Sequence, residues 1–425
     1  YAYALKGRDW LQEHYTATTQ QLTYLLARDS ADGDPLDGLI RSSQGDWKDV
    51  GSMRRLWRVG AVFFVNVAYL RALRVAAEMA TALGHKEDAQ HWSELREHGV
   101  AMLHRDVANG GLWLPEHGYY ADWVQVDGEK SWVYPLDLDD VTVFTAFSTT
   151  AHGMALAEGL IPHERVTQIV DAIQRLGLLS PFPAPAKYPF YDTLRETGHD
   201  ASIAESIALS NPWELKELFP DLPGWLTYDM VLPWKGWPGN HVWGGRWMMS
   251  GAWLTLGLWR AGYGEMARQA QQNLAKALLR ARHPGRCEET ESYSAVSREE
   301  TGSHVDPAGY YQLWSGAVPL QALVEGEYGI LPTPYGVQID FRHYTLGDGI
   351  EKVPIRGGTL SCRRQTETDY IIRLDTATAG KLRVKLHAQV LQINGGEQVS
   401  GQQGDDLWVQ YKPHSNVHIR IKNKE

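Results

Sequence analysis

The fold is decided by residues 54–82, RRLWRVGAVFFVNVAYLRALRVAAEMATA, where apolar residues fall on most faces of a helix. A helix that is apolar nearly all round must be buried nearly all round. After the turn at Gly84, residues 86–106 are rich in charges, and their apolar residues recur at every third or fourth position. That pattern is typical of a helix with one buried stripe. The two segments therefore predict an inner helix followed by an outer helix.

The same pairing recurs further along the chain. The later segments are 140–158 with 163–177, 243–262 with 264–282, and a last apolar segment at 308–324. We expect Pro162 in the first turn of the second outer helix, where its missing N–H costs nothing. Repeated hairpins of a buried and a half-buried helix indicate two concentric helical layers. The sequence predicts a mainly α fold, an (α/α)6 toroid of inner and outer helices over residues 1–330.

The last quarter of the chain has a different pattern. Pro332 and Pro334 end the helical periodicity, and beyond them β-branched residues alternate with polar ones. The expected strands cover residues 337–341, 369–374, 381–386, 388–393, 407–411 and 416–421, with glycine pairs at 357–358 and 395–396. Residues 331–425 are predicted to form a small C-terminal antiparallel β-sandwich that covers part of the barrel.

Charge and hydropathy exclude two classes of partner. The net charge of the 425 residues is −10, and residues 1–330 alone carry −13. An acidic surface without Lys/Arg-rich runs repels phosphate backbones, so we expect no nucleic-acid partner. No stretch of 18 apolar residues would span a membrane. The chain opens at Tyr1 without a basic-then-apolar leader, which fits either a cytoplasmic protein or an exported one whose leader has been removed.

The two cysteines restrict the covalent and metal chemistry. Cys287 and Cys362 allow one disulfide at most, and their spacing fits no metal-ligand motif. We therefore expect neither a metal ion nor a cofactor.

The chemistry is expected in the loops at the ends of the inner helices, which converge in a helical toroid. The first such loop, SSQGDWKDVGSMRRLW at 42–57, places Asp46 and Asp49 on either side of Trp47. The alternative is structural, with Asp49 or Ser52 as the N-cap of the helix that follows.

Two further loops are rich in aromatic residues. GLWLPEHGYYADW at 111–123 carries Trp113 and Tyr120, and YPLDLDD at 134–140 ends on Asp139 and Asp140, one of which is expected to cap the next helix. PWKGWPGNHVWGGRWMM at 233–249 holds Trp234, Trp237, Asn240, His241, Trp243, Arg246 and Trp247. Flat aromatic faces beside Asn, His and Arg donors suit a sugar ring, so we predict substrate-binding roles for these residues.

The fourth loop, CEETESYSAVSREETGSHVDPAGYYQLWSGAV at 287–318, is acidic and includes Glu291, Tyr293 and Trp314. Most of its carboxylates are expected on the surface. Hydrolysis of a glycosidic bond needs one carboxylic acid and one carboxylate on opposite sides of the sugar. A closed barrel would bring Asp46 and Asp49 close to Glu291, and an aromatic surround would raise the pKa of the acid.

At these loops the sequence resembles the (α/α)6-barrel glycoside hydrolases, especially the trehalase and processing α-glucosidase families (37 and 63) and more loosely the α-L-rhamnosidases. The resemblance implies inverting hydrolysis, with an acid in a loop like GDWKDVGSMRR and a base in a Glu-x-Tyr motif, here Glu291-Ser292-Tyr293. The β-tail is similar to the C-terminal sandwich of the rhamnosidase type, whose N-terminal β-domain would then be missing here.

The sequence departs from the family pattern at two places. The acid of those families follows the tryptophan directly, whereas Asp46 precedes Trp47 and Asp49 comes two positions after it. Asp49 is favoured, because Asp49-Val-Gly-Ser-Met-Arg54 resembles the family's Asp-x-Ser-x-Arg, and Asp46 would then contact sugar hydroxyls. The family's Trp-Arg-Gly-Pro-x-Trp is replaced by Trp243-Gly-Gly-Arg-Trp247, with Trp234-Lys-Gly-Trp237 as a rival match. The sugar specificity is therefore not carried over.

The prediction is an inverting, exo-acting glycoside hydrolase of an oligosaccharide. Three alternatives stay open at this point. A polysaccharide lyase would use His241, Tyr293 or Tyr310 as base, with Asn240 and Arg246 neutralising a uronate. An inverting disaccharide phosphorylase would also show a GDW loop followed by Asp, and a non-catalytic sugar-binding protein would need only the aromatic loops.

Overall fold

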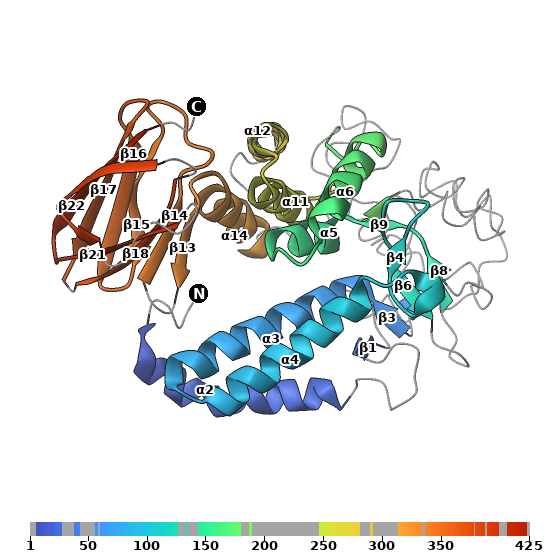
Figure 1. Cartoon of the computed structure of the whole chain (residues 1–425). Helices are drawn as coiled ribbons and strands as arrows, with labels where there is room; N and C mark the ends of the chain where they lie inside the picture. Colours follow the sequence, from blue (N-terminus) through green and yellow to red (C-terminus); the bar gives the residue numbers. More distant parts are fainter. Residues whose placement is uncertain are drawn as a thin grey trace. The chain divides into compact units, whose positions relative to one another are not determined.

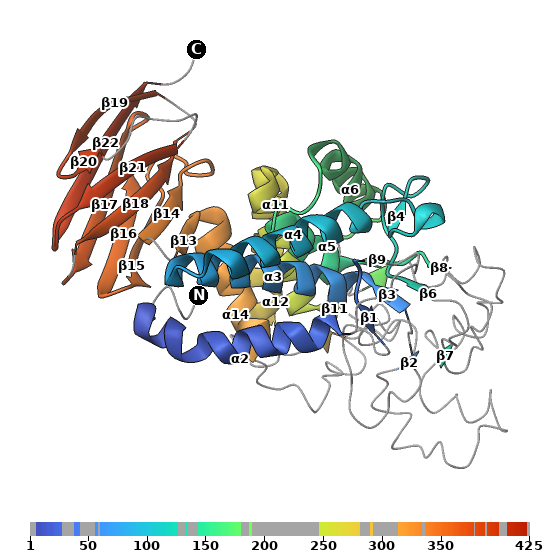
Figure 2. The ribbon, with the colours of Figure 1, turned by 60° about the horizontal axis from the view of Figure 1, so that its bottom comes forward.

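The structure is a computed structural model, drawn in Figures 1 and 2. It describes residues 6–27, 38–42, 56–57, 60–125, 132–133, 143–179, 187–188, 246–280, 290–291, 313–333, 336–377, 379–386, 389–398 and 406–422. The chain forms two compact units. One comprises Tyr1–Gln21, Val75–Trp92 and Gln321–Glu425, and the other Leu22–Arg74 and Ser93–Leu320.

Three of the expected inner–outer hairpins are present. They are α3 (Phe63–Leu83) with α4 (Lys86–Leu103), α5 (Thr149–Ala157) with α6 (His163–Arg175), and α11 (Met248–Ala261) with α12 (Gly264–Arg280). All nine residues of α5 are buried, as are the first twelve of α11, whereas α6 buries one stripe. The remaining described helices are α2 (Arg8–Leu26), η1 (Val107–Asn109), α14 (Leu313–Gln321) and the π-helix η2 (Ala322–Glu327). The prediction of a buried helix followed by a half-buried one is confirmed for α5 with α6 and for α11 with α12, whereas α3 was wrongly predicted to be buried nearly all round: its buried residues, such as Phe63, Leu70 and Leu73, alternate with partly buried ones.

The inner helices begin later than predicted, because each follows a short strand. β3 (Gly60–Val62) precedes α3, β9 (Phe147–Ser148) precedes α5, and β11 (Arg246–Trp247) precedes α11. The expected starts at residues 54, 140 and 243 were therefore wrong. A fully buried strand and a fully buried helix are both continuous apolar runs, so periodicity does not separate them.

The helix α6 begins at His163, as predicted. Pro162 is its N-cap, with φ −57° and ψ 144°, rather than a residue of its first turn.

The inner helices α3, α5 and α11 run in the same direction. Near the start of α5, Thr150 Oγ1 lies 2.7 Å from Ser250 Oγ of α11, and near its end Arg260 donates to the Ala157 carbonyl over 2.9 Å. The side chain of Phe63, the first residue of α3, lies against His152 with ring centroids 4.7 Å apart. Parallel inner helices are what an α/α toroid requires; the closed ring of six hairpins stays a prediction.

The end of α5 is tied to the middle of α3 by charge. Glu158 follows the last turn of α5 and accepts from Arg71 Nε over 3.0 Å and from Arg74 Nη2 over 2.9 Å, with its own side chain only 5% exposed. The Arg71 guanidinium also lies over the Trp253 ring of α11, 5.3 Å from its centroid. These contacts link the end of α5 and the middle of α11 to the middle of α3.

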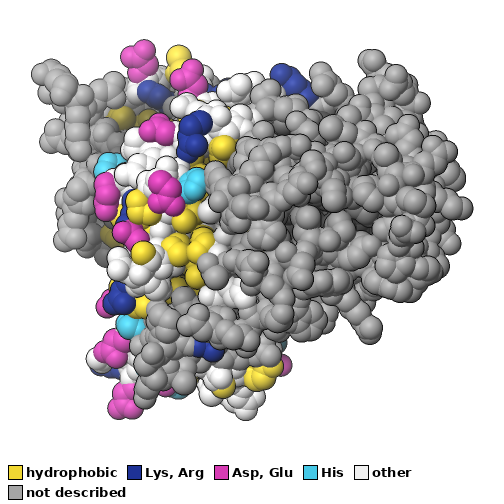
Figure 3. All heavy atoms as spheres, turned by 90° about the vertical axis from the view of Figure 1, so that its right-hand side faces the viewer, with side chains coloured by type: hydrophobic (Ala, Val, Ile, Leu, Met, Phe, Trp, Pro, Cys, Tyr) yellow, Lys and Arg dark blue, Asp and Glu magenta, His cyan; other side chains and the backbone are white. Residues whose placement is uncertain are grey.

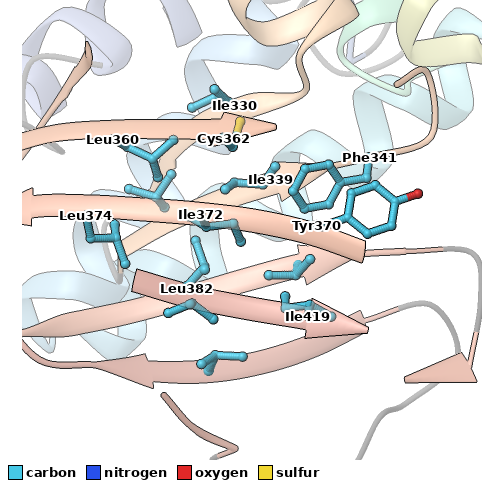
Figure 4. Packing of buried hydrophobic residues seen from close by; sticks show 14 of the residues in the cluster. Ile330, Ile339, Phe341, Leu360, Cys362, Tyr370, Ile372, Leu374, Leu382 and Ile419 are labelled. Carbon is cyan, nitrogen blue, oxygen red and sulfur yellow. The ribbon is translucent and has the colours of Figure 1, made fainter. Parts of the chain in front are cut away.

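The C-terminal strands form two five-stranded sheets, in the orders β13-β14-β18-β21-β20 and β15-β16-β17-β22-β19. Their bounds are β13 Ile330–Thr333, β14 Gly336–Asp340, β15 Gly349–Ile355, β16 Gly358–Arg364, β17 Asp369–Thr376, β18 Gly380–Lys385, β19 Gln389–Asn394, β20 Glu397–Gln398, β21 Asp406–Tyr411 and β22 Ser415–Lys422. Apolar side chains from both sheets, including Ile339, Leu360, Ile372 and Leu382, form one core (Figure 4). The six predicted strands are confirmed.

The β region differs from the prediction in its pairing and in four strands that were not predicted, β13, β15, β16 and β20. β14 and β18 pair in parallel, so the first sheet is mixed rather than antiparallel. β15 was missed because its Lys352 and Pro354 interrupt the alternation, and its pairing with β16 shifts register at this point. Cys362 of β16 is a buried free thiol that lies 2.8 Å from the Tyr344 hydroxyl, and burial raises its pKa to about 12. The single disulfide that two cysteines would allow is not formed.

The surface side chains are mixed in chemical type. On the face shown in Figure 3, acidic, basic and apolar side chains of the described residues are interspersed. None of the described helices is long and apolar enough to cross a membrane.

Candidate functional site

The candidate site lies at the N-terminal ends of the inner helices, where the short strands pair. β1 (Arg41–Ser42), β3, β6 (Trp123–Gln125) and β8 (Val143–Phe144) form a small sheet before α3. β9 pairs with β10 (Lys187–Tyr188) before α5, and β11 pairs with β12 (Thr290–Glu291) before α11. Each loop that carries predicted chemistry enters or leaves through one of these strands.

The pairing of β11 with β12 brings together two predicted site residues from distant parts of the chain. Arg246 and Glu291 are direct partners in this antiparallel pair, and Trp247 is opposite Thr290. Residues directly opposite each other in an antiparallel pair have Cα atoms about 4.5–5.5 Å apart. Because β11 continues into α11, the predicted base and a predicted sugar-contacting residue meet at the start of an inner helix.

The loop with the predicted acid is held by strands on both sides. On its N-terminal side β1 pairs with β3, Arg41 opposite Ala61, and on its C-terminal side β2 (Leu56–Trp57) pairs with β7 (Trp132–Val133). Asp46, Trp47 and Asp49 themselves lie outside the described residues. Paired strands therefore flank these residues on both sides in the sequence.

The capping alternative for this loop was wrong. α3 begins at Phe63, whose N–H donates to the Asp122 carbonyl over 2.9 Å, so neither Asp49 nor Ser52 is its N-cap. The N-cap of α5 is Ser148, so the expectation that Asp139 or Asp140 caps that helix was wrong as well.

Asn66 anchors the strand that leads into the acid loop. This buried side chain of α3 accepts from the Ile40 N–H over 2.8 Å and donates to the carbonyls of Ile40 and Val62 over 3.2 and 3.0 Å. An amide side chain that satisfies both backbone groups of Ile40 replaces a missing strand neighbour. No sequence signal marks this role, since Asn66 stands within an apolar run.

Replacing Asn66 by alanine is expected to lower the free energy of unfolding by about 3 kcal/mol, because it leaves buried backbone groups of Ile40 unpaired. Asn273→Ala is the matched control, since Asn273 makes one bond, to the Leu179 carbonyl over 3.2 Å, from a part-buried position. Urea unfolding followed by tryptophan fluorescence measures both. Equal losses in the two variants would contradict the anchoring role of Asn66.

Trp113 and Tyr120 occupy the hairpin of β4 (Trp113–Leu114) and β5 (Tyr119–Tyr120). Trp113 is 4% exposed and lies under the Arg165 guanidinium, 4.2 Å from the ring centroid, while Tyr120 is fully buried. The Tyr120 hydroxyl donates to His104 Nδ1 over 2.8 Å, and His104 Nε2 donates to the Leu160 carbonyl over 2.9 Å. The structure gives both aromatic residues a packing role; sugar contacts by them stay a prediction.

His152 links this hairpin to α5, and sequence reasoning missed it. Its Nδ1 donates to the Ser148 carbonyl over 2.8 Å, and its Nε2 accepts from the Tyr120 N–H over 3.1 Å, which fixes a neutral tautomer. The ring stacks on Phe147 with centroids 3.9 Å apart. Complete burial lowers the pKa of His152 to about 3.

His152 is expected to stay neutral in the folded protein from pH 8 down to about pH 4. Its pKa falls from 6.5 when unfolded to about 3 when folded, so below pH 6.5 the unfolded state binds a proton that the native state does not. The contribution of neutral His152 to the free energy of unfolding is therefore complete above pH 6.5. Below that pH it is lost, by up to about 1.4 kcal/mol per pH unit. Nitrogen-15 NMR of labelled histidine should show an Nδ1–H tautomer at pH 5. A protonation midpoint near 6.5 would contradict this placement.

The structure describes only some of the other predicted site residues. Trp234, Trp237, Asn240, His241, Trp243 and Tyr293 lie outside the described residues. Trp314 stands in the first turn of α14. Among the described residues, no group of three or more His, Cys, Asp or Glu is arranged to hold a metal ion.

Residues 3–173 match the model of a family described as the bacterial alpha-L-rhamnosidase 6 hairpin glycosidase domain. No curated protein matches the chain. The match covers less than half of the 425 residues.

Among solved structures, a GH78 family rhamnosidase of Bacillus sp. GL1 is similar over 86% of this chain and 30% of its own, with 16% identity and a TM-score of 0.51. A structure described as a sialidase is similar over 85% of this chain and 28% of its own, with 11% identity and a TM-score of 0.56. A GH63 mannosylglycerate hydrolase from Thermus thermophilus reaches 17% identity, 62% and 47% coverage, and a TM-score of 0.35, too low to carry an argument. At these identities the first two similarities concern the fold, and the chain spans less than a third of either structure.

Proposed function

We propose that this chain, whose residues 3–173 match a six-hairpin glycosidase domain, is an inverting, exo-acting glycoside hydrolase that removes a terminal sugar from an oligosaccharide. Its catalytic part would be residues 1–330, and the β-sandwich of residues 331–425 would have a structural role. Glu291 is the general base that activates water, and Asp49 is the general acid, with Asp46 as the rival acid or as a contact to sugar hydroxyls.

The observation that carries the proposal is the β11–β12 pair. Glu291 comes from the loop before the last inner helix and Arg246 from the loop before α11, yet they are direct partners in register. The pairing places the backbone of the proposed base at the start of the inner helix α11, opposite a residue of the proposed sugar subsite.

The acid is assigned to the other side of the sugar. In inverting enzymes the two carboxyl groups stand about 6.5–9.5 Å apart, which leaves room for the attacking water. The loop with Asp46 and Asp49 departs from β1 and returns through β2, both in paired strands at the start of α3. Because α3, α5 and α11 begin at the same end, the strands β1 and β3 before α3 and the β11–β12 pair before α11 lie at that end.

The sugar subsite is proposed for the loop that ends on β11. Trp234, Trp237, Asn240, His241, Trp243 and Trp247 would supply stacking faces and hydrogen-bonding groups, with Tyr293 and Trp314 from the loop of the base. Trp113 and Tyr120 would line the wall behind them. An aromatic pocket of this kind holds one terminal sugar, which is why exo-cleavage is proposed.

A screen of aryl glycosides and natural oligosaccharides tests the activity. We expect release of a terminal sugar without added phosphate. Turnover that requires phosphate would identify a phosphorylase, a product absorbing as an unsaturated uronate would identify a lyase, and binding without release would identify a sugar-binding protein. Each of these outcomes would overturn the hydrolase proposal.

Leaving-group chemistry separates the candidate acids. A glycoside with a dinitrophenyl leaving group needs no protonation, so loss of the true acid should spare this substrate and abolish turnover of an alkyl glycoside. We expect this selective loss, by about a hundredfold or more on the alkyl glycoside, in Asp49→Asn. The same selective loss in Asp46→Asn, with Asp49→Asn unaffected, would assign the acid to Asp46.

A further inference from the structure

The middle strand of one C-terminal sheet has a cationic outer side. In β18, Leu382 and Val384 are buried in the core of the sandwich, so Lys381, Arg383 and Lys385 lie on the outer face of the sheet. Successive side chains on one face of a strand stand about 6.6 Å apart. Three cations therefore follow one line along the middle of this face.

Carboxylates of the same face do not neutralise these charges. Among the described side chains of the face, Asp340 is the single carboxylate, and it pairs with Arg342 over 2.9 Å. Lys381 is exposed and Lys385 is partly exposed, and neither has an ion-pair or hydrogen-bond partner in the described part of the chain. Unpaired charges of one sign on one surface attract a ligand of the opposite sign. The row therefore indicates a surface for an anionic ligand.

A tryptophan adjoins this row of cations. Gln338, Arg383 and Trp408 are register partners across β14, β18 and β21. Arg383 Nη1 donates to Gln338 Oε1 over 3.3 Å, and the Arg383 guanidinium lies 5.8 Å from the centroid of the Trp408 ring. Trp408 is partly exposed, whereas its neighbours Leu407 and Val409 are fully buried. An indole held in this way on a flat face offers apolar surface to the C–H groups of a sugar ring.

The next row of the face adds an amide that can bond hydroxyl groups. Gln410 is exposed and stands opposite Lys381. Ring faces, hydroxyl groups and carboxylates occur together in a polysaccharide that contains uronic acids. A single-stranded nucleic acid would instead be bound by several stacking aromatics along a basic groove. Trp408 is the single aromatic residue among the described side chains of this outer face, which favours the polysaccharide.

We propose that the outer face of the sheet β13-β14-β18-β21-β20 binds a linear polysaccharide that carries carboxylates. Lys381 and Lys385 pair with the carboxylates, and Trp408 stacks on a sugar ring. This gives residues 331–425 a binding role in addition to a structural one. The inference does not depend on the hydrolase proposal, since binding to this face needs no turnover.

Isothermal titration of the full chain with polygalacturonate tests the proposal, with dextran as the neutral probe. We expect at least tenfold tighter binding of polygalacturonate, weakening as salt is raised. Equal binding of the two polymers, no binding of polygalacturonate, or tighter binding of single-stranded DNA would overturn the proposal. A hydrolase without affinity for polygalacturonate would overturn this inference alone, and polymer binding without any turnover would overturn the hydrolase proposal alone.

Two variants and a control locate the binding to this face. Lys381→Gln/Lys385→Gln and Trp408→Ala should each weaken polygalacturonate binding about tenfold and leave kcat/KM for a small aryl glycoside unchanged. Arg363→Gln/Arg373→Gln, which removes two charges from exposed positions of the other sheet, is the matched control and should change the affinity less than about twofold. The double lysine variant keeps every core residue, so it stays informative if Trp408→Ala fails to fold. Wild-type affinity in the double lysine variant would overturn the proposal.

Discussion

Glu291→Gln is expected to lower kcat by about a thousandfold or more, with both alkyl and dinitrophenyl glycosides as substrates. A general base acts on the attacking water whatever the leaving group, so an activated leaving group does not rescue its loss. Glutamine has the shape of glutamate but no basic oxygen, so the β11–β12 pair should still form. Steady-state kinetics on the two substrates, with circular dichroism and the melting temperature as checks of folding, measure the effect.

The matched control for this variant is Glu265→Gln. Glu265 is an exposed carboxylate in the first turn of α12, remote in role from the proposed site, and its replacement should leave kcat within about twofold. If Glu291→Gln keeps near-full activity while folded, Glu291 is not the base. If it loses activity only with the alkyl glycoside, it acts as the acid instead.

Gly153→Ala is expected to destabilise the helical unit by about 3 kcal/mol, although alanine favours helix formation by about 1 kcal/mol over glycine. A Cβ at this position would lie 2.5 Å from the Leu254 backbone nitrogen and 2.6 Å from the Trp253 carbonyl oxygen of α11. Backbone atoms of a buried helix cannot move aside as a flexible side chain can. Gly257 completes the contact, since its own Cβ would lie 2.6 Å from the Gly153 carbonyl oxygen.

Gly159→Ala is the control that separates the effect of close helix packing from the effect of replacing a glycine. Gly159 follows α5 with φ +62°, and no atom would lie within 4 Å of its Cβ. Its replacement should cost only about 1 kcal/mol, the strain of a left-handed backbone at alanine. Thermal unfolding monitored by circular dichroism compares the two. A Gly153→Ala protein as stable as the wild type would contradict the close approach of α5 and α11.

The outer helices could be predicted because their amphipathic pattern is typical of a half-buried helix. The charged face and apolar stripe of residues 86–106 specify a half-buried helix, and α4 covers Lys86–Leu103. The buried segments carried less information. Within 140–158, Phe147 and Ser148 form a strand, and nothing in an apolar run marks where the strand gives way to α5 at Thr149.

The roles of the predicted site residues stay predictions, and the contacts among them could not be read from the sequence. The Glu-x-Tyr motif points to Glu291 as a candidate base, but its pairing with Arg246 depends on strand register between distant segments, which no local pattern specifies. Asn66 was missed for a related reason. It is a polar residue in an apolar run, and its role depends on what the fold brings next to it, the Ile40 backbone.

The most direct test of the central claim is proton NMR of the first sugar released from a substrate of known anomeric configuration. A base that activates water on the face opposite the leaving group gives a product of inverted configuration. We therefore expect the inverted anomer to appear first and the other anomer to follow only by mutarotation. Initial formation of the retained anomer would contradict the assignment of Glu291 as the base that activates water.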